Sequence, residues 1–105
     1  MSYIYDNIAM YDVETTGEFD YWLGSIRDGK TQKVIVKRVR TMSLGTLGKV
    51  RSLDNGLYEA KIDYGPGYRL YFVNKGLKII VLLCGGDKST QQADIKNARK
   101  LAKEI

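Results

Sequence analysis

The sequence predicts a single α+β domain spanning residues 1–105, with a mostly antiparallel sheet, an N-terminal helical hairpin and a C-terminal helix. Three observations lead to this fold class: helical periodicity between residues 15 and 45, β-type patterns between residues 50 and 84, and an amphipathic final segment. No linker, repeat or low-complexity tract divides the chain, and 105 residues suffice for one hydrophobic core. The expected element order is β-α-α-β-β-β-α.

The N-terminal part of the chain predicts one strand and two helices. The stretch "IAMYDVE" (residues 8–14) alternates loosely and is rich in β-forming residues, as in a strand. In "TTGEFDYWLGSIRD" (residues 15–28), apolar residues recur at the spacing of a helix face: Phe19, Trp22, Leu23 and Ile26. A second helix is expected in "GKTQKVIVKRVRTMSLG" (residues 29–45), and the junction at Asp28-Gly29 makes the pair an αα-hairpin.

The remaining elements are three strands and a helix. "GLYEAKIDY" (residues 56–64) and "YRLYFVN" (residues 68–74) flank a Gly-Pro-Gly turn and predict a β-hairpin. The continuous apolar run in "LKIIVLLC" (residues 77–84) indicates a central strand covered on both faces. "STQQADIKNARKLAKEI" (residues 89–105) has a capping-box start and an apolar stripe, which predict a helix. We expect the helices to pack on one side of the sheet.

The hairpin sorts its side chains onto two faces. If Tyr64 pairs with Tyr68 around a three-residue loop, Asp63 lies opposite Arg69 and Lys61 opposite Tyr71. Alternation then predicts an apolar face and an open charged face, the latter made of Glu59, Lys61, Asp63, Arg69 and Tyr71. The charged face is either solvated, with an Asp63–Arg69 pair contributing about 0.2–1 kcal/mol, or an RNA- or phosphate-binding surface. A shift of one residue would exchange the two faces.

Composition narrows the chemistry that the chain can perform. Seventeen Lys and Arg against twelve Asp and Glu give a net charge of +5, which favours an anionic partner such as nucleic acid. The absence of histidine excludes Ser-His and Cys-His nucleophile pairs and His-ligated zinc. Cys84, the single cysteine, ends an apolar run and is expected to be a buried hydrophobe. Catalysis would therefore use Lys, Arg, Tyr or carboxylates, and we expect neither a metal nor a cofactor.

Two other patterns bear on location and on anion binding. The N-terminal stretch lacks the pattern of a signal peptide, and the longest apolar run, six residues, is far shorter than a membrane span, so we expect a cytoplasmic protein. "CGGDKSTQQ" (residues 84–92) places two glycines, Asp87 and Lys88 before the last helix, where free N–H groups can receive an anion. "SLGTLGKV" (residues 43–50) is not a P-loop, because Ser43 and Val50 replace required residues.

Two long motifs carry a family resemblance. They are "EAKIDYGPGYRLYF" (residues 59–72) and "VLLCGGDKSTQQADI" (residues 81–95), accompanied by "FDYWLGSIRD" and "GKVRSL". Together they resemble the addiction-module killer branch, HigB/RelE-like, of the RelE/ParE superfamily of type II toxins, from about residue 10 to the C-terminus. The resemblance implies a metal-free, ribosome-dependent mRNA endonuclease in which a ribose 2′-hydroxyl attacks the adjacent phosphate. It also implies a cognate antitoxin, often a helix-turn-helix protein, as partner beside the ribosome and mRNA.

The resemblance also implies roles for individual residues. Arg69 would bind the phosphate and stabilise the charge of the transition state. Lys61 would be the general base, and Lys88 would neutralise or protonate the leaving oxygen. Lys49 and Arg51 would hold the RNA backbone, and Tyr71 would be available for base stacking. Basic residues of the second helix would contact ribosomal RNA, or else form a solvated face: Lys30, Lys33, Lys37 and Arg40.

The sequence departs from the ribonuclease pattern at two positions. Asp94 stands where an aromatic residue or histidine is common, and Glu59 stands where some relatives carry another base. Asp87 or Asp94 is therefore an alternative proton acceptor to Lys61. Two other functions stay open: a ParE-like, non-enzymatic inhibitor of DNA gyrase, and an inactive remnant that binds the antitoxin only.

Overall fold

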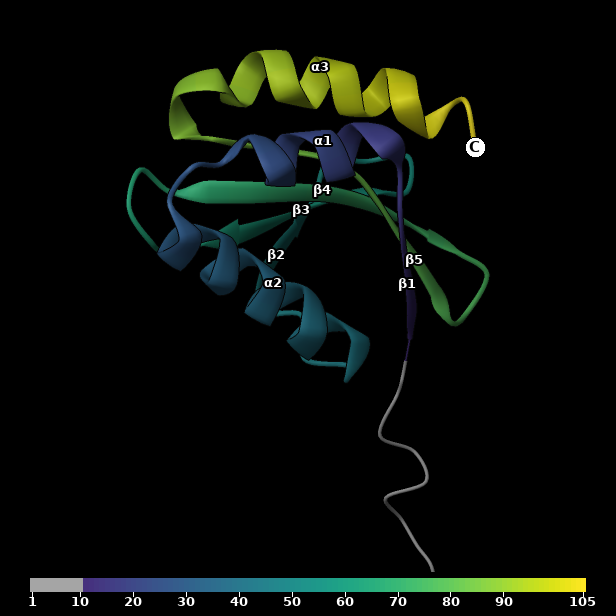
Figure 1. The fold of residues 1–105 in the computed structure, drawn as a ribbon. Coiled ribbons are helices and arrows are strands. Elements are labelled where there is room, and N and C mark those ends of the chain that lie inside the picture. The colour runs from purple at the N-terminus through teal and green to yellow at the C-terminus, as the bar shows by residue number, and fades with distance from the viewer. Residues whose placement is uncertain (1–10) are drawn as a thin grey trace, which may run out of the picture.

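The computed structural model describes residues 11–105, which form a five-stranded sheet with helices on both faces (Figure 1). The elements in chain order are β1 (Asp12–Thr15), α1 (Gly17–Ser25), α2 (Gly29–Ser43), β2 (Lys49–Ser52), β3 (Leu57–Ile62), β4 (Tyr68–Lys75), β5 (Ile79–Asp87), the 3-10 turn η2 (Lys88–Thr90) and α3 (Gln91–Ala102). The strand order across the sheet is β1-β5-β4-β3-β2. Strand β1 runs parallel to β5 and the other neighbours are antiparallel, which confirms the expected fold class.

Two details differ from the expected element order. Strand β2 lies in "GKVRSL", which was not expected to form a strand of its own, so four strands follow the two helices. Residues 8–10 of the expected first strand lie outside the described residues, and β1 begins at Asp12. The predicted helices and the hairpin are all present within a few residues of their expected bounds.

Both long N-terminal helices begin at a side-chain cap. Thr16 Oγ1 accepts a hydrogen bond of 3.0 Å from the Phe19 amide, and the same hydroxyl donates one of 2.6 Å to the Leu83 carbonyl. Asp28 accepts hydrogen bonds from the Lys30 amide and, at 2.7 Å, from the Thr31 hydroxyl. Such caps satisfy the amides that the first helical turn leaves free. The Thr16 cap also ties the start of α1 to β5.

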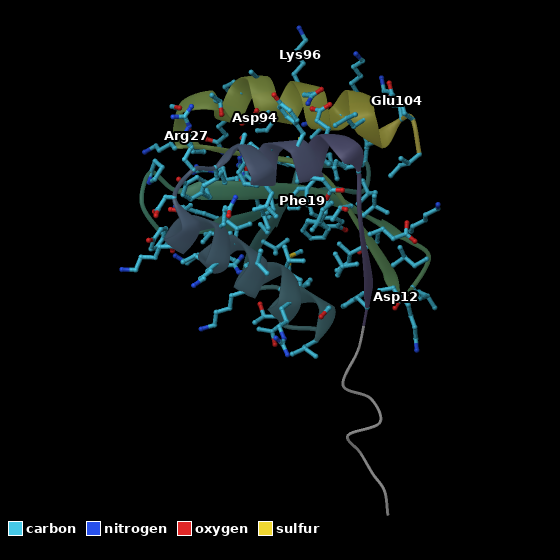
Figure 2. All side chains as sticks on the ribbon, in the orientation of Figure 1. Asp12, Phe19, Arg27, Asp94, Lys96 and Glu104 are labelled. Atoms are coloured by element: carbon cyan, nitrogen blue, oxygen red, sulfur yellow. The ribbon has the colours of Figure 1, made fainter. Side chains whose placement is uncertain are left out.

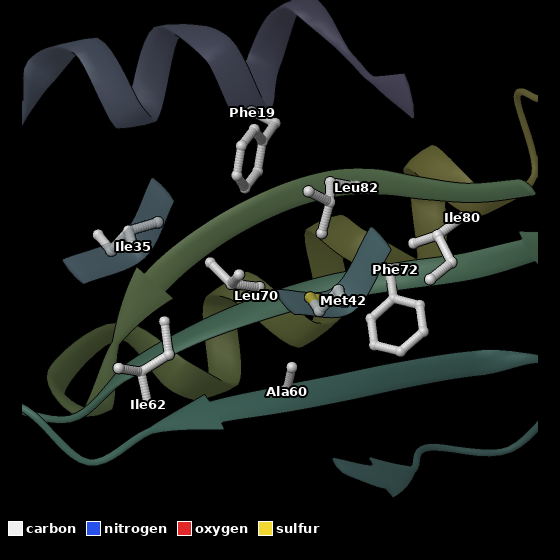
Figure 3. Close-up of a cluster of buried hydrophobic side chains, with 9 residues drawn as sticks. All are labelled: Phe19, Ile35, Met42, Ala60, Ile62, Leu70, Phe72, Ile80 and Leu82. Carbon is white, nitrogen blue, oxygen red and sulfur yellow. The ribbon is translucent and has the colours of Figure 1, made fainter. Parts of the chain in front are cut away.

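Hydrophobic side chains pack on both faces of the sheet. On one face, residues of α1 and α2 meet apolar side chains from β3, β4 and β5 (Figure 3): Phe19, Ile35, Met42, Ala60, Ile62, Leu70, Phe72, Ile80 and Leu82. On the other face, α3 covers a second cluster: Leu53, Leu57, Tyr71, Val81, Leu83, Cys84 and Ala98. Figure 2 shows Lys96 on the outer side of α3, pointing away from the strands. The expectation that every helix packs on one side is therefore wrong. Strands β4 and β5 are apolar on both faces, so each face needs a cover.

The two glycines that follow the apolar part of β5 are required by packing. A Cβ on Gly85 would lie 2.3 Å from the ring of Trp22, and a Cβ on Gly86 would lie 1.8 Å from a carboxylate oxygen of Asp94. Helix α1 thus approaches one face of β5 and helix α3 the other, at adjacent residues. The two glycines allow both helices to pack closely on the strand. The Asp87 side chain caps η2 by accepting from the Ser89 amide at 2.8 Å, whereas Thr90, the N-cap of α3, makes no capping hydrogen bond through its side chain.

The register of the β3–β4 hairpin differs from the prediction by two residues. Ile62 pairs with Tyr68 and Lys61 with Arg69, rather than Tyr64 with Tyr68 and Lys61 with Tyr71. The loop is five residues long (63–67), because Tyr64 and Gly67 make turn hydrogen bonds within it. Since side chains alternate with a period of two, a shift of two residues leaves the predicted faces unchanged. Residues Glu59, Lys61, Arg69 and Tyr71 of the strands do share one face.

Candidate functional site

A groove opens on the face of the sheet that α3 only partly covers. Its volume is about 620 Å³, and it lies over β2, β3 and the start of β4, next to the first residue of α3. Its lining residues are Lys49, Val50, Arg51, Glu59, Lys61, Arg69 and Gln91. The pairings of Lys49 with Lys61, Lys61 with Arg69, and Arg51 with Glu59 bring these side chains together across three strands. We call this site the groove.

The charge of the groove is strongly positive. Four of its lining side chains are cationic, whereas Glu59 is the one carboxylate among the lining residues. The four cations come from three neighbouring strands, so their spacing is fixed by the sheet. Such a cluster in a hollow attracts a polyanion and holds it by charge-assisted hydrogen bonds.

Glu59 is the centre of the hydrogen-bond network on the groove floor. It is 4% exposed, and it accepts hydrogen bonds from Arg51 Nε at 2.7 Å and from Gln91 Nε2 at 3.0 Å. Its Oε2 also lies 3.8 Å from Arg69 Nε. Burial raises the pKa of Glu59, but the hydrogen bonds from Arg51 and Gln91 outweigh burial, so the pKa lies below the ordinary value. Glu59 is therefore ionised at neutral pH.

Arg69 is a buried cation in the wall of the groove. Its side chain is 8% exposed, and its Nη1 donates to the Gly67 carbonyl at 2.9 Å. Its Nε makes no hydrogen bond to any described residue. A guanidinium stays charged even when buried, and its planar fork suits phosphate oxygens. The buried Nε lies towards Glu59 Oε2, while the residue lines the groove and contributes its positive charge to it.

Tyr71 does not offer its ring to a ligand. Its side chain is fully buried beneath α3, so the prediction that Tyr71 stacks on a base is wrong for this structure. Its hydroxyl makes no hydrogen bond to any described residue. Burial, together with the negative charge of Glu59, raises the pKa of Tyr71, so the phenol remains neutral. The expected open charged face is in fact closed at this end by the C-terminal helix.

Lys49 and Lys61 share a carboxylate at the mouth of the groove. Lys49 Nζ lies 2.5 Å and Lys61 Nζ 3.5 Å from oxygens of Asp63, and all three side chains are about half exposed or more. The hydrogen bond from Lys49 lowers the pKa of Asp63. The predicted Asp63–Arg69 pair is therefore wrong, because Asp63 belongs to the loop and faces the lysines instead.

The other predicted catalytic residues do not line the groove. Asp87 caps η2, and its Oδ1 accepts from the Ser89 amide and hydroxyl. Asp94 packs against Gly86, accepts a hydrogen bond of 2.5 Å from Thr90, and has its pKa raised chiefly by burial. Lys88 is exposed and flanks the groove, since its Cβ lies 4.0 Å from where a Cβ on Gly67 would stand. Asp94 is nevertheless near Arg69, because Gly86 pairs with Arg69 across the sheet, but it does not line the groove.

The basic residues of α2 form a separate surface. Lys33, Lys37 and Arg40 are exposed and line a shallow hollow on the outside of the helix, which lies on the opposite side of the sheet from α3 (Figure 1). They do not converge with the groove, although Lys37 lines a second hollow that also contains Lys49. Lys30 is exposed at the start of the same helix.

Sequence reasoning did not predict the roles of two residues of the groove. Glu59 was placed on the correct face, but its burial and its hydrogen bonds depend on where α3 lies. Gln91 reaches Glu59 from 32 positions away in the chain. The alternation of β3 was the one signal that pointed to Glu59, and no local signal pointed to Gln91.

The described residues give no sign of a metal site or of a membrane span. Residues 11–105 contain no cluster of three or more carboxylates or thiols that could hold a metal ion. Within the same residues, no helix combines the length and the apolar character needed to cross a bilayer.

Comparison with known proteins adds a relative and a fold. No family model matches the chain. An uncharacterised protein of Haemophilus influenzae is 41% identical over 93 residues, which cover 89% of this chain and 94% of that protein. The chain belongs to the same family as this protein. The fold is also similar to a chain in the crystal structure of the E. coli DinJ-YafQ toxin-antitoxin complex, with a TM-score of 0.51 and 17% identity over 77% of this chain and 96% of that chain. This similarity confirms the RelE-like fold expected from the sequence.

Proposed function

We propose that this chain is the toxin of a type II toxin-antitoxin module, of the HigB/RelE-like kind, and that it cleaves messenger RNA on the ribosome. The observation that carries the proposal is the groove, where four cations from three strands, the buried Arg69 among them, line one hollow. The similarity of the fold to a chain of a toxin-antitoxin complex supports it. The net charge of +5 also suits partners made of RNA.

The proposed reaction needs only groups that the chain and its substrate possess. The ribose 2′-hydroxyl attacks the adjacent phosphorus, the bond to the 5′-oxygen of the next nucleotide breaks, and a 2′,3′-cyclic phosphate results. Arg69 contacts the phosphate and stabilises the negative charge that grows on it in the transition state. Lys49 and Arg51 hold the neighbouring backbone, and Lys88, at the edge of the groove, donates to the departing oxygen.

The groove contains two candidates for the general base. Lys61 lines it but must lose its proton before it can accept one. Glu59 is ionised, lies 3.8 Å from Arg69, and has lone pairs beyond those that Arg51 and Gln91 occupy. Among the carboxylates, Glu59 thus replaces Asp87 and Asp94 as the favoured proton acceptor, with Lys61 supporting the charge of the phosphate.

The proposed partners follow from the same function. A cognate antitoxin, often a helix-turn-helix protein in such modules, would neutralise the toxin. The ribosome would present the messenger, and the exposed cations of α2 would contact ribosomal RNA: Lys30, Lys33, Lys37 and Arg40. The reaction takes place in the cytoplasm and uses no cofactor.

Cell-free translation tests this function against its alternatives. The purified chain is added to a translation reaction, and messenger ends are mapped by primer extension with and without ribosomes. Cuts within translated codons that require ribosomes are expected. Intact messenger with normal protein output would reject the proposal. An arrest of DNA supercoiling by purified gyrase would then identify a gyrase inhibitor, and activity in neither assay an inactive antitoxin-binding protein.

A further inference from the structure

A second hollow lies next to the groove and contains two side chains, Arg38 and Tyr64, that the proposed reaction does not use. It is formed between α2, the residue before β2, and the end of β3, with a volume of about 480 Å³. The residues that matter are Lys37, Arg38, Gly48, Lys49, Asp63 and Tyr64. We call it the α2–β2 hollow. Three cations and one aromatic ring share this space with a single carboxylate.

Arg38 is held in the hollow by close packing. A Cβ on Gly48 would lie 2.9 Å from Arg38 Cζ and 3.1 Å from both terminal nitrogens, and Gly48 has a φ of +74°. A glycine is favoured here for its backbone conformation, and an added Cβ would displace the guanidinium, the flexible end of the Arg38 side chain. The Arg38 guanidinium is thus partly buried beside Gly48 and lines the hollow.

Arg38 has no counter-ion of its own. Its Nη1 donates a long hydrogen bond of 3.5 Å to the Leu47 carbonyl, and no carboxylate of the described residues forms an ion pair with it. Burial lowers the pKa of Arg38, yet a guanidinium remains charged. Asp63 also faces the hollow, but Lys49 and Lys61 already bind its two oxygens. A half-buried cation in this state is stabilised by an external anion.

The hollow is continuous with the groove. Lys49 lines both, and β2 is the edge strand of the sheet, so a path of cations runs from Arg69 around this edge to Arg38. Tyr64 is half-buried beside the same path. Alternation of cations with an aromatic ring along a groove is the pattern by which proteins bind single-stranded nucleic acid.

We propose that the α2–β2 hollow binds a second nucleotide of the RNA strand that occupies the groove, with Arg38 on its phosphate and Tyr64 stacked on its base. This rests on the function proposed above. A single strand is favoured over an acidic protein segment because the hollow shares a cation with the groove and adds a ring. An RNA that fills only the groove will not reach Arg38, whereas a longer strand will.

Binding of two lengths of RNA tests this subsite. Fluorescently labelled 2′-O-methyl RNAs, a trinucleotide and an octanucleotide, are titrated with the purified chain at several salt concentrations. Arg38→Gln should weaken octanucleotide binding about tenfold. It should also reduce the slope of log affinity against log salt by about 0.7, the value for one lost phosphate contact on a single strand. Arg38→Gln should leave the affinity for the trinucleotide unchanged. Gly48→Ala, which displaces the guanidinium, should act in the same direction.

The controls separate this subsite from the proposed function. Lys78→Gln removes one exposed charge at the far end of the sheet and should change neither affinity. Unchanged octanucleotide binding in Arg38→Gln, with both lengths still weakened by Arg69→Gln, would overturn the subsite and leave the groove intact. An equal loss for both lengths would also overturn it. If Arg69→Gln alters neither length, the proposed function fails and the subsite with it. If Arg38→Gln weakens only the complex with the antitoxin, the hollow is a protein interface.

Discussion

Replacing Glu59 with glutamine should destabilise the protein and slow RNA cleavage. Glu59 and Arg69 are 4% and 8% exposed at their side chains, and their nearest atoms are 3.8 Å apart. Removing one member of a buried ion pair typically costs about 3–5 kcal/mol, because the remaining charge has lost its solvent and its partner. Arg69 keeps its bond to the Gly67 carbonyl and glutamine keeps one acceptor oxygen. We therefore expect a loss of about 2–4 kcal/mol in the free energy of unfolding.

The assay is urea unfolding followed by the fluorescence of Trp22, the single tryptophan. Arg51→Gln is a matched control, because Arg51 is another partner of the Glu59 carboxylate but its own side chain is 58% exposed. An exposed partner is worth only about 0.2–1 kcal/mol, so the two variants should differ clearly. If the free energy of unfolding of Glu59→Gln lies within about 0.5 kcal/mol of the wild-type value, the buried hydrogen-bond network of Glu59 does not stabilise the fold as described.

The same variant tests the role of Glu59 as a proton acceptor. Cleavage by the wild type should decline as pH falls through the lowered pKa of Glu59, and the variant should lack this decline and be slower by about 10²–10⁴-fold. A variant that keeps the wild-type pH profile, only slower, would show that Glu59 positions Arg69 and that Lys61 is the base. This readout separates proton transfer from positioning, which a stability measurement alone does not.

Two further predictions concern packing and pH. Gly85→Ala should cost about 1–3 kcal/mol in stability, because its Cβ would lie 2.3 Å from the Trp22 ring. Gly24 lies on α1, and a Cβ added there would have no atom within 4 Å. Gly24→Ala should therefore stabilise the protein by about 0.5–1 kcal/mol, and equal changes in stability for the two glycine variants would contradict the close packing of Trp22 on Gly85.

The raised pKa of Asp94 means that its contribution to stability is present below its unfolded pKa of about 3.9 and is lost as pH rises through the folded value. Asp94→Asn, whose side chain can still accept from Thr90, should remove this pH dependence and stabilise the protein at neutral pH. Denaturant unfolding of both proteins across pH measures the difference. If Asp94 is solvated, the wild type and the variant will show the same dependence of stability on pH.

Periodicity within the sequence was sufficient to predict most elements of the fold. The helical spacing of Phe19 with Trp22, and the alternation in β3 and β4, both reflect local geometry that a sequence records directly. Strand β2 was missed because its four residues are mostly exposed and carry too short a pattern. The side on which α3 packs was also missed, since an amphipathic stripe predicts burial without saying against which face.

The candidate site also has features that local patterns predict and features that depend on long-range packing. The alternation of side chains in the hairpin placed Lys61 and Arg69 on one face, and the sheet does bring them together. The burial of Tyr71, and the contact of Gln91 with Glu59, arise only when α3 closes over the strands. Such long-range contacts leave no local pattern in the sequence. The carboxylates near the last helix looked available for catalysis, but they cap η2 or pack against Gly86.

The most direct test of the proposed active site is single-turnover cleavage of messenger held in the ribosome. Wild type, Arg69→Gln and Lys78→Gln are compared, after Trp22 fluorescence has shown that each is folded. Arg69→Gln should slow cleavage by about 10²–10³-fold, the loss typical when one donor to a transition-state oxyanion is removed. Lys78→Gln should cleave at the wild-type rate. Cleavage by folded Arg69→Gln at nearly the wild-type rate would contradict the assignment of the groove as the site of RNA cleavage.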